Sequence, residues 1–265
     1  MKLYYIFFLA LLISLSIKTK AQVFSEQTNI SLQFVEKSSV AWGDYDNDGD
    51  LDILLTGRID NQHNSIKIYQ NDTLLSGQDR VFIEKSIITV YGIRTGTVVW
   101  GDYDNDGDLD ILLSGESMMG YITKICRNEP ALSGQGRRFV EQTAIVLTGV
   151  FDASVAWGDY DNDGDLDFIL TGYEYIFQGQ QQIYRRTKIY RNEPSAIGNN
   201  RSFVEQTGIH LDGVGQGSVA WGDYDNDGYL DILMTGYTDE NDLSIIYHND
   251  PFPYSNFHDM LKLAS

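Results

Sequence analysis

An acidic nine-residue cassette with the spacing of a metal-binding loop occurs four times, at residues 44–52, 102–110, 159–167 and 223–231. The first three copies read Asp-Tyr-Asp-Asn-Asp-Gly-Asp-Leu-Asp. Aspartates at positions 1, 3 and 5 converge on one cation if the loop curls around it, and glycine at position 6 permits the backbone conformation that the curl requires. Calcium takes about six to eight oxygen ligands of this kind, whereas magnesium suits an all-protein cage less well. We therefore interpret the cassette as a calcium loop.

Two further positions complete the predicted ligand set. Position 7 offers its carbonyl oxygen, which explains why Tyr229 replaces the aspartate of the other copies, and position 9 closes the site from the next strand. An EF-hand loop begins in the same way but needs glutamate at position 12 and flanking helices. Position 12 is leucine or methionine here, at Leu55, Leu113, Leu170 and Met234. The remaining alternative is a solvated acidic turn without metal, which four copies disfavour because crowded aspartates repel one another.

The elements that must position these loops are short β-strands. The first positions of the cassettes are 58, 57 and 64 residues apart, which is the period of a repeat architecture. Each copy follows a segment ending in Trp-Gly, precedes an apolar strand such as Leu51–Leu55, and is followed by a third strand and a fourth that opens with phenylalanine. Four antiparallel strands per repeat predict a β-propeller blade. The four tryptophans are expected to fill the space between blades, with the loops on one face and the variable hairpins on the other.

The motif Trp-Gly-Asp-Tyr-Asp-Asn-Asp-Gly-Asp-Leu-Asp, followed by Ile-Leu-Leu-Thr-Gly, resembles the FG-GAP/VCBS repeat. That repeat forms the calcium-loop blades of integrin alpha-subunit propellers and of many bacterial secreted proteins. The resemblance covers nearly all of residues 22–265 and implies up to four Ca²⁺ ions and a role in adhesion or recognition. The implied ligands are Asp44, Asp46, Asp48, Asp50, Asp52, Asp102, Asp104, Asp106, Asp108, Asp110, Asp159, Asp161, Asp163, Asp165, Asp167, Asp223, Asp225, Asp227, Tyr229 (through its carbonyl) and Asp231.

The number of cassettes departs from the family, whose propellers usually carry seven blades. A segment of the fourth-strand type, Phe24–Thr28, precedes the first blade, and Met260–Leu263 keeps the spacing of that strand without its pattern. We therefore expect an all-β fold of four four-stranded blades forming an open arc, as a fragment of a longer propeller. A closed small ring and a dimeric ring are the alternatives, and the open blade edges suggest self-association.

Composition bounds the compartment and the partners. Residues 1–21 have the charged start, apolar core and small-residue exit of a signal peptide, which predicts a secreted or cell-surface protein, a retained membrane anchor being the alternative. The net charge of −19 arises in the cassettes, which hold 19 aspartates, and no basic stripe suggests nucleic acid as a partner. The single cysteine, Cys126, excludes an internal disulfide and occupies a tyrosine position of the third strand.

No catalytic constellation is evident, so we do not expect an enzyme. The histidines occupy unrelated repeat positions, at His63, His210, His248 and His258. Ligand binding is better suited to the variable hairpins, of which residues 173–186 form the longest and most aromatic, although an ordinary hairpin with surface aromatics also explains them. The sequence predicts a calcium-stabilised module for protein or glycan recognition. The alternative is a partial or non-catalytic propeller of a polysaccharide-acting enzyme such as a lyase.

Overall fold

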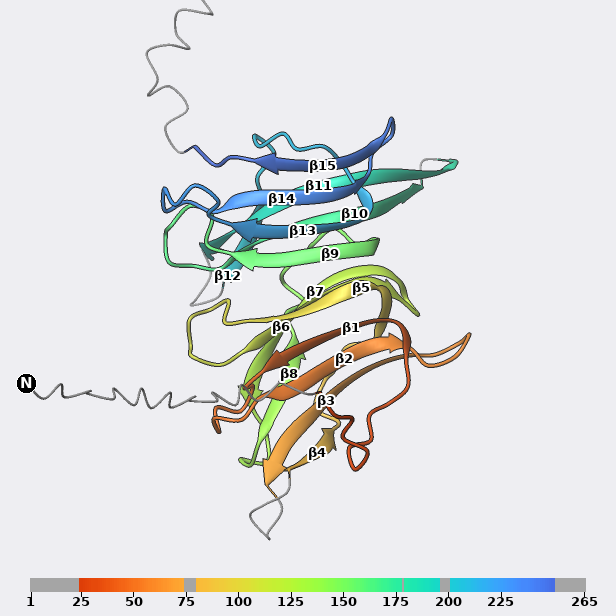
Figure 1. Cartoon of the computed structure of the whole chain (residues 1–265), viewed down its shortest axis with the longest axis vertical. Helices are drawn as coiled ribbons and strands as arrows, with labels where there is room; N and C mark the ends of the chain where they lie inside the picture. Colours follow the sequence, from red (N-terminus) through yellow and green to blue (C-terminus); the bar gives the residue numbers. More distant parts are fainter. Residues whose placement is uncertain (1–23, 74–79, 178, 196–200, 251–265) are drawn as a thin grey trace, which may run out of the picture. The chain divides into compact units, whose positions relative to one another are not determined.

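The computed structural model describes residues 24–73, 80–177, 179–195 and 201–250. All regular structure in these residues is β-strand, arranged in four antiparallel sheets that follow one another along the sequence (Figure 1). The predicted all-β fold of propeller-type blades is thus confirmed. None of the described residues forms a helix long and apolar enough to cross a bilayer.

Each of the first three sheets has four strands in sequential order. The first sheet consists of β1 (Glu36–Gly43), β2 (Asp52–Arg58), β3 (Asn64–Thr73) and β4 (Arg80–Lys85). The second consists of β5 (Ile93–Gly101), β6 (Asp110–Ser117), β7 (Gly120–Pro130) and β8 (Arg137–Glu141). The third consists of β9 (Val150–Gly158), β10 (Asp167–Phe177), β11 (Gln181–Pro194) and β12 (Arg201–Glu205).

The fourth sheet contains three described strands, β13 (Gly215–Gly222), β14 (Asp231–Tyr237) and β15 (Asp242–Tyr247). Its expected fourth strand, Met260–Leu263, lies outside the described residues. The prediction of a strand at Phe24–Thr28 is wrong. These residues carry the fourth-strand pattern but pair with no described strand, and they belong to a separate unit, residues 1–31, whose described part forms only a turn.

Packing between consecutive sheets explains why the second strand of each blade is almost continuously apolar. In β2, Leu54 faces the second sheet and joins Ile68, Val98 and Ile111 in one buried cluster. Its neighbours in the strand point to the opposite face, because side chains alternate along a strand. The same arrangement recurs between the second and third sheets and between the third and fourth. Burial on both faces therefore requires a hydrophobic residue at successive positions.

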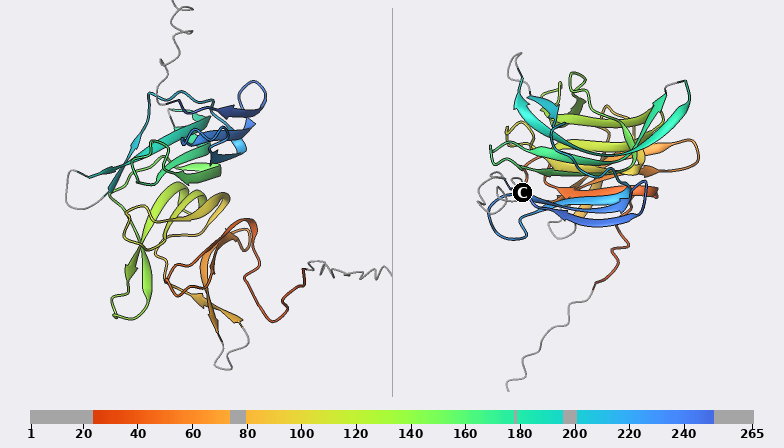
Figure 2. Two further views of the ribbon diagram at one scale, coloured as in Figure 1. Left: turned by 60° about the vertical axis from the view of Figure 1, so that its left-hand side comes forward. Right: turned by 90° about the horizontal axis from the view of Figure 1, so that it is seen from above.

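The first strands line up along these junctions, with β1 against β5, β5 against β9 and β9 against β13 (Figure 2). Among the described strands, extensive contacts join consecutive sheets, and none joins the first sheet to the fourth. Trp100, Trp157 and Trp221 are partly buried at the junctions, as the sequence predicts. Trp42 is the exception, because the strand that carries it has no preceding sheet to pack against in the described part of the chain, and it is exposed.

Candidate metal centres

Each cassette connects the first and second strands of its sheet and is closed by its own aspartates. In the first loop, Asp44 Oδ1 and Oδ2 accept hydrogen bonds from the backbone N–H groups of Asp48 (3.0 Å) and Gly49 (2.9 Å). Asn47 and Gly49 have φ angles of 60° and 91°, in the left-handed region that asparagine and glycine tolerate best. The other three loops repeat these bonds and angles. The sequence Asp-x-x-Asn-Asp-Gly thus dictates the curl.

Carboxylate oxygens converge inside every loop. Positions 1 and 3 each supply an oxygen to a group whose members lie within 4.8 Å of one another. The third member is position 5 in the first loop and position 9 in the other three, at Asp48, Asp110, Asp167 and Asp231. The structure therefore brings together three predicted ligands per loop, from positions 1, 3, 5 and 9.

The side chains at position 7 are engaged elsewhere. They pair with an arginine of the fourth strand or its start, in the pairs Asp50–Arg80, Asp108–Arg137 and Asp165–Arg201. This pairing leaves the carbonyl oxygen as the atom that position 7 offers to an ion, in line with the presence of Tyr229 in the fourth loop.

Position 9 fastens the loop to the third strand. Asp110 Oδ2 accepts from the Tyr103 N–H (3.2 Å), and its Oδ1 accepts from the Asn128 N–H (2.7 Å). The carboxyl group is fully buried, and this desolvation raises its pKa to about 8, with the Asp104 carboxylate adding to the rise. Burial raises the pKa of Asp52 to about 6 and that of Asp167 to about 7. A cation beside these carboxylates would favour their ionised form.

The oxygen at position 3 shows whether a cation fits the loop. Asp46 Oδ1, Asp104 Oδ1 and Asp161 Oδ1 are each buried without a hydrogen-bond partner among the described residues. A buried carboxylate oxygen without a partner is strongly disfavoured. The same carboxyl groups belong to the sets that converge on one point in each loop, so a hard cation bound there would give the unpartnered oxygen a ligand. The donor set, all oxygen and mostly carboxylate, is one that calcium prefers.

A model of the FG-GAP-like repeat family matches residues 44–113, which run from the first cassette to the end of the second apolar strand motif. Residues 44–113 form an FG-GAP-like repeat. The later cassettes carry nearly the same motif on sheets of the same design. No curated protein matches the chain.

Sequence analysis missed a polar residue, in the third strand or directly after it, that contacts each loop of these repeats. In the second repeat, Arg127 Nε and Nη2 lie 2.8 Å from Asp104 Oδ2 and 2.9 Å from Asp106 Oδ2. The equivalents are Gln70, which bonds Asp46, Arg191, which lies 3.8 Å from Asp161, and His248, which lies 3.1 Å from Asp225. The sequence could have revealed this residue, because it directly precedes the recurring asparagine of the third strand in every repeat. His248, which the sequence left without a partner, therefore has one.

The strand-three asparagine is a second missed residue, and it links one repeat to the loop of the preceding repeat. Asn128 Nδ2 donates to the carbonyl of Tyr45 (2.8 Å) in the preceding loop and to that of Leu109 (3.1 Å) in its own. Asn192 and Asn249 repeat both bonds. The sequence marked this asparagine only as the end of a strand, because nothing local to it reveals a partner about 80 residues away.

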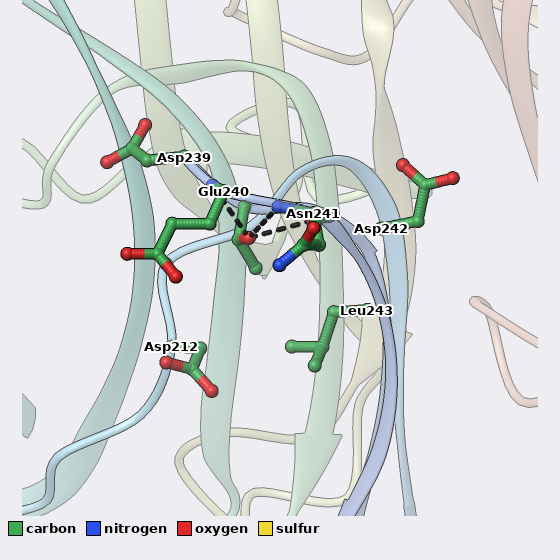
Figure 3. Close-up of a pocket in the computed structure, with 8 residues that line it drawn as sticks. Asp212, Asp239, Glu240, Asn241, Asp242 and Leu243 are labelled. Atoms are coloured by element: carbon green, nitrogen blue, oxygen red, sulfur yellow. Dashed lines mark hydrogen bonds between the residues drawn. The ribbon is translucent and has the colours of Figure 1, made fainter.

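The hairpin end of the fourth repeat carries an acidic hollow lined by Asp212, Asp239, Glu240 and Asp242 (Figure 3). The Thr238 hydroxyl organises the turn, accepting from the N–H groups of Glu240 and Asn241. Figure 3 shows the four carboxylates pointing in different directions, and no group of three comes together as in the loops. Asp239 pairs with Arg185, and Asp212 accepts from the Tyr247 hydroxyl. The hollow therefore lacks the convergence of the metal loops.

The long hairpin of the third repeat carries the aromatic residues that the sequence singled out. Tyr173 stacks on Phe151 with ring centroids 5.1 Å apart, and Phe151 in turn lies 4.5 Å from Tyr121 of the second repeat. Phe177 and Ile183, nearer the tip, are exposed. Part of the aromatic set is therefore packing between repeats, and two apolar side chains near the tip are exposed.

Proposed function

We propose that the chain is a calcium-stabilised module of FG-GAP-like repeats that recognises a protein or glycan ligand and has no catalytic activity. The observation that supports calcium best is the buried, unpartnered oxygen at position 3 of three loops. Calcium would be held by carboxylates of positions 1, 3, 5 and 9 and by the carbonyl of position 7. The ion supplies a fixed positive charge that balances the converging aspartates.

The ion would act as a structural clip. Position 9 already ties each loop to the third strand, as Asp52 does through the N–H of Asn71 (2.8 Å). Because a ligand that binds only the folded state adds to stability, calcium at a hundred times its dissociation constant would stabilise the fold by about 2.7 kcal/mol per site. This coupling accounts for how a chain with one cysteine is stabilised without disulfides.

The test compares two isosteric substitutions in the second loop. Asp104→Asn alters the position-3 oxygen and should remove one of the calcium ions counted by isothermal titration calorimetry, with a smaller rise in melting temperature on adding calcium. Asp108→Asn removes the same charge at position 7, where the carbonyl is the ligand, and should leave the count unchanged. Equal stoichiometry in the two variants, or a wild-type melting temperature that excess chelator does not change, would contradict the proposal.

We place recognition at the hairpin end of the repeats, away from the loops, and the exposed side chains of Phe177 and Ile183 support this placement. Export is supported by the signal-like residues 1–21. A glycan array probed with the wild type and with Phe177→Ser tests the placement of recognition, because binding to any glycan should weaken in the variant. N-terminal sequencing of the exported protein tests whether residues 1–21 are removed as a signal peptide, and a chain that still begins at Met1 would contradict this.

A further inference from the structure

The three junctions between consecutive repeats share one contact, in which a tryptophan packs on a glycine of the preceding repeat. A Cβ atom placed on the glycine would lie 2.6 Å from the ring, so the ring needs the bare backbone. The pairs are Gly43–Trp100, Gly101–Trp157 and Gly158–Trp221. Each glycine immediately precedes a cassette, and each tryptophan immediately precedes the glycine of the next repeat.

The first repeat presents the tryptophan side of this contact without a glycine partner among the described residues. Its upstream face, formed by Val40, Trp42 and Leu51, is 61%, 59% and 55% exposed at these residues. Val98, which occupies the place of Val40 in the second repeat, is 1% exposed. The contrast arises because the second repeat packs against a preceding sheet, whereas the described part of the chain has no sheet before the first repeat.

The fourth repeat presents the glycine side. Its downstream face is formed by Gly222, Leu233 and Ile246. No described atom lies within 4 Å of a Cβ placed on Gly222, and Leu233 and Ile246 are 51% and 53% exposed. Leu54 and Ile68, their equivalents in the first repeat, are fully buried against the second repeat.

Polar groups on the two faces are also complementary. At the first internal junction, Asn128 donates to the carbonyl of Tyr45 in the preceding loop (2.8 Å). The same register would place the side chain of Asn71, on the upstream face, at the carbonyl of Tyr224, on the downstream face.

A second polar pair runs in the opposite direction. Asn47 Nδ2 donates to Asp108 Oδ1 of the following loop (2.8 Å), and Asn105 donates to Asp165 in the same way (2.7 Å). By that register, Asn226 of the fourth loop would donate to Asp50 of the first. Asp50 pairs with an arginine, as Asp108 and Asp165 do, so the three acceptor carboxylates have the same neighbour.

We infer that the upstream face of one copy of this chain packs against the downstream face of a second copy, head to tail, as a fourth instance of the internal junction. Both faces stay exposed in the single chain, so they do not cover each other there. They carry the apolar and hydrogen-bonding groups that pair at the internal junctions, which makes a second copy a fitting occupant. Such an interface is heterologous and leads to a closed ring or to longer chains. It does not depend on the ligand proposed above.

The test uses one variant on each face. Trp42→Ser removes the ring, and Gly222→Val fills its place with a side chain. Sedimentation velocity of the wild type in calcium-containing buffer should show a mass that rises with concentration to twice that of one chain or more. Each variant alone should remain monomeric. Mixed together, they should form a dimer and nothing larger, because the mixture has one intact pair of faces.

The control is Leu132→Ser, which removes an exposed apolar side chain from a turn of the second repeat and should associate as the wild type does. Thermal melts of the variants at low concentration show that they fold. A wild type that stays monomeric at every concentration would overturn the inference. So would a single variant that still associates, or a mixture of the two variants that forms no dimer.

Discussion

At the scale of the residue, the four loops share their aspartates but differ in the third-strand side chain that lies against them. Arg127 places a guanidinium on Asp104 and Asp106, whereas Gln70 offers a neutral amide to the first loop. A guanidinium there competes with a cation for the negative charge of the same carboxylates. The loops are therefore expected to differ in calcium affinity although their cassettes are nearly identical.

Replacing Arg127 by Gln, the residue of the first repeat, should raise the calcium affinity of the second loop severalfold, because a partly exposed ion pair of this kind is worth up to about 1 kcal/mol. Isothermal titration calorimetry measures the change. Arg191→Gln is the matched control, since Arg191 is held by Glu193 and lies 3.8 Å from Asp161, and its effect should be smaller. A larger effect at Arg191 than at Arg127 would contradict the competition.

At the scale of the element, the strands could be predicted because their causes are local. The nearly continuous apolar run around Leu54 predicts a strand buried on both faces, and the sequence Asp-x-x-Asn-Asp-Gly predicts the curl of the loop. The partner of Asn128 could not be predicted, because it belongs to a loop of another sheet. Phe24–Thr28 also shows that local sequence is not sufficient, because a segment with a strand pattern but no pairing strand does not form a strand.

The strand-three asparagine should matter most where it bridges two repeats. Asn128→Ala leaves the carbonyls of Tyr45 and Leu109 without this donor in a buried setting, which should lower the free energy of unfolding by about 1–3 kcal/mol. Asn71→Ala is the matched control at the first repeat, where the amide donates to Leu51 of its own loop (3.1 Å), and it should cost less. Urea unfolding followed by tryptophan fluorescence measures both, and equal losses would contradict a bridging role.

At the scale of the whole molecule, residues 32–250 are a linear series in which each repeat gains its core from its neighbours. The clusters that contain Leu54, Leu112 and Ile169 each draw on two consecutive sheets. In such arrays the stability is approximately a sum of repeat and junction contributions. A change at an internal junction should therefore weaken the fold more than the same change at a terminal face.

Glycine at the junction gives the sharpest test of this series. Gly101→Val introduces a side chain whose Cβ would lie 2.6 Å from the Trp157 ring, and overpacking of this kind costs about 1–3 kcal/mol. Gly222→Val, at the corresponding position of the fourth repeat, meets no described atom within 4 Å and should leave the stability of the single chain nearly unchanged. Urea unfolding at a concentration low enough to keep the chain monomeric compares the two. If both variants lost the same stability, the junctions would not carry the fold, and the difference between Gly101 and Gly222 would need a cause within each sheet.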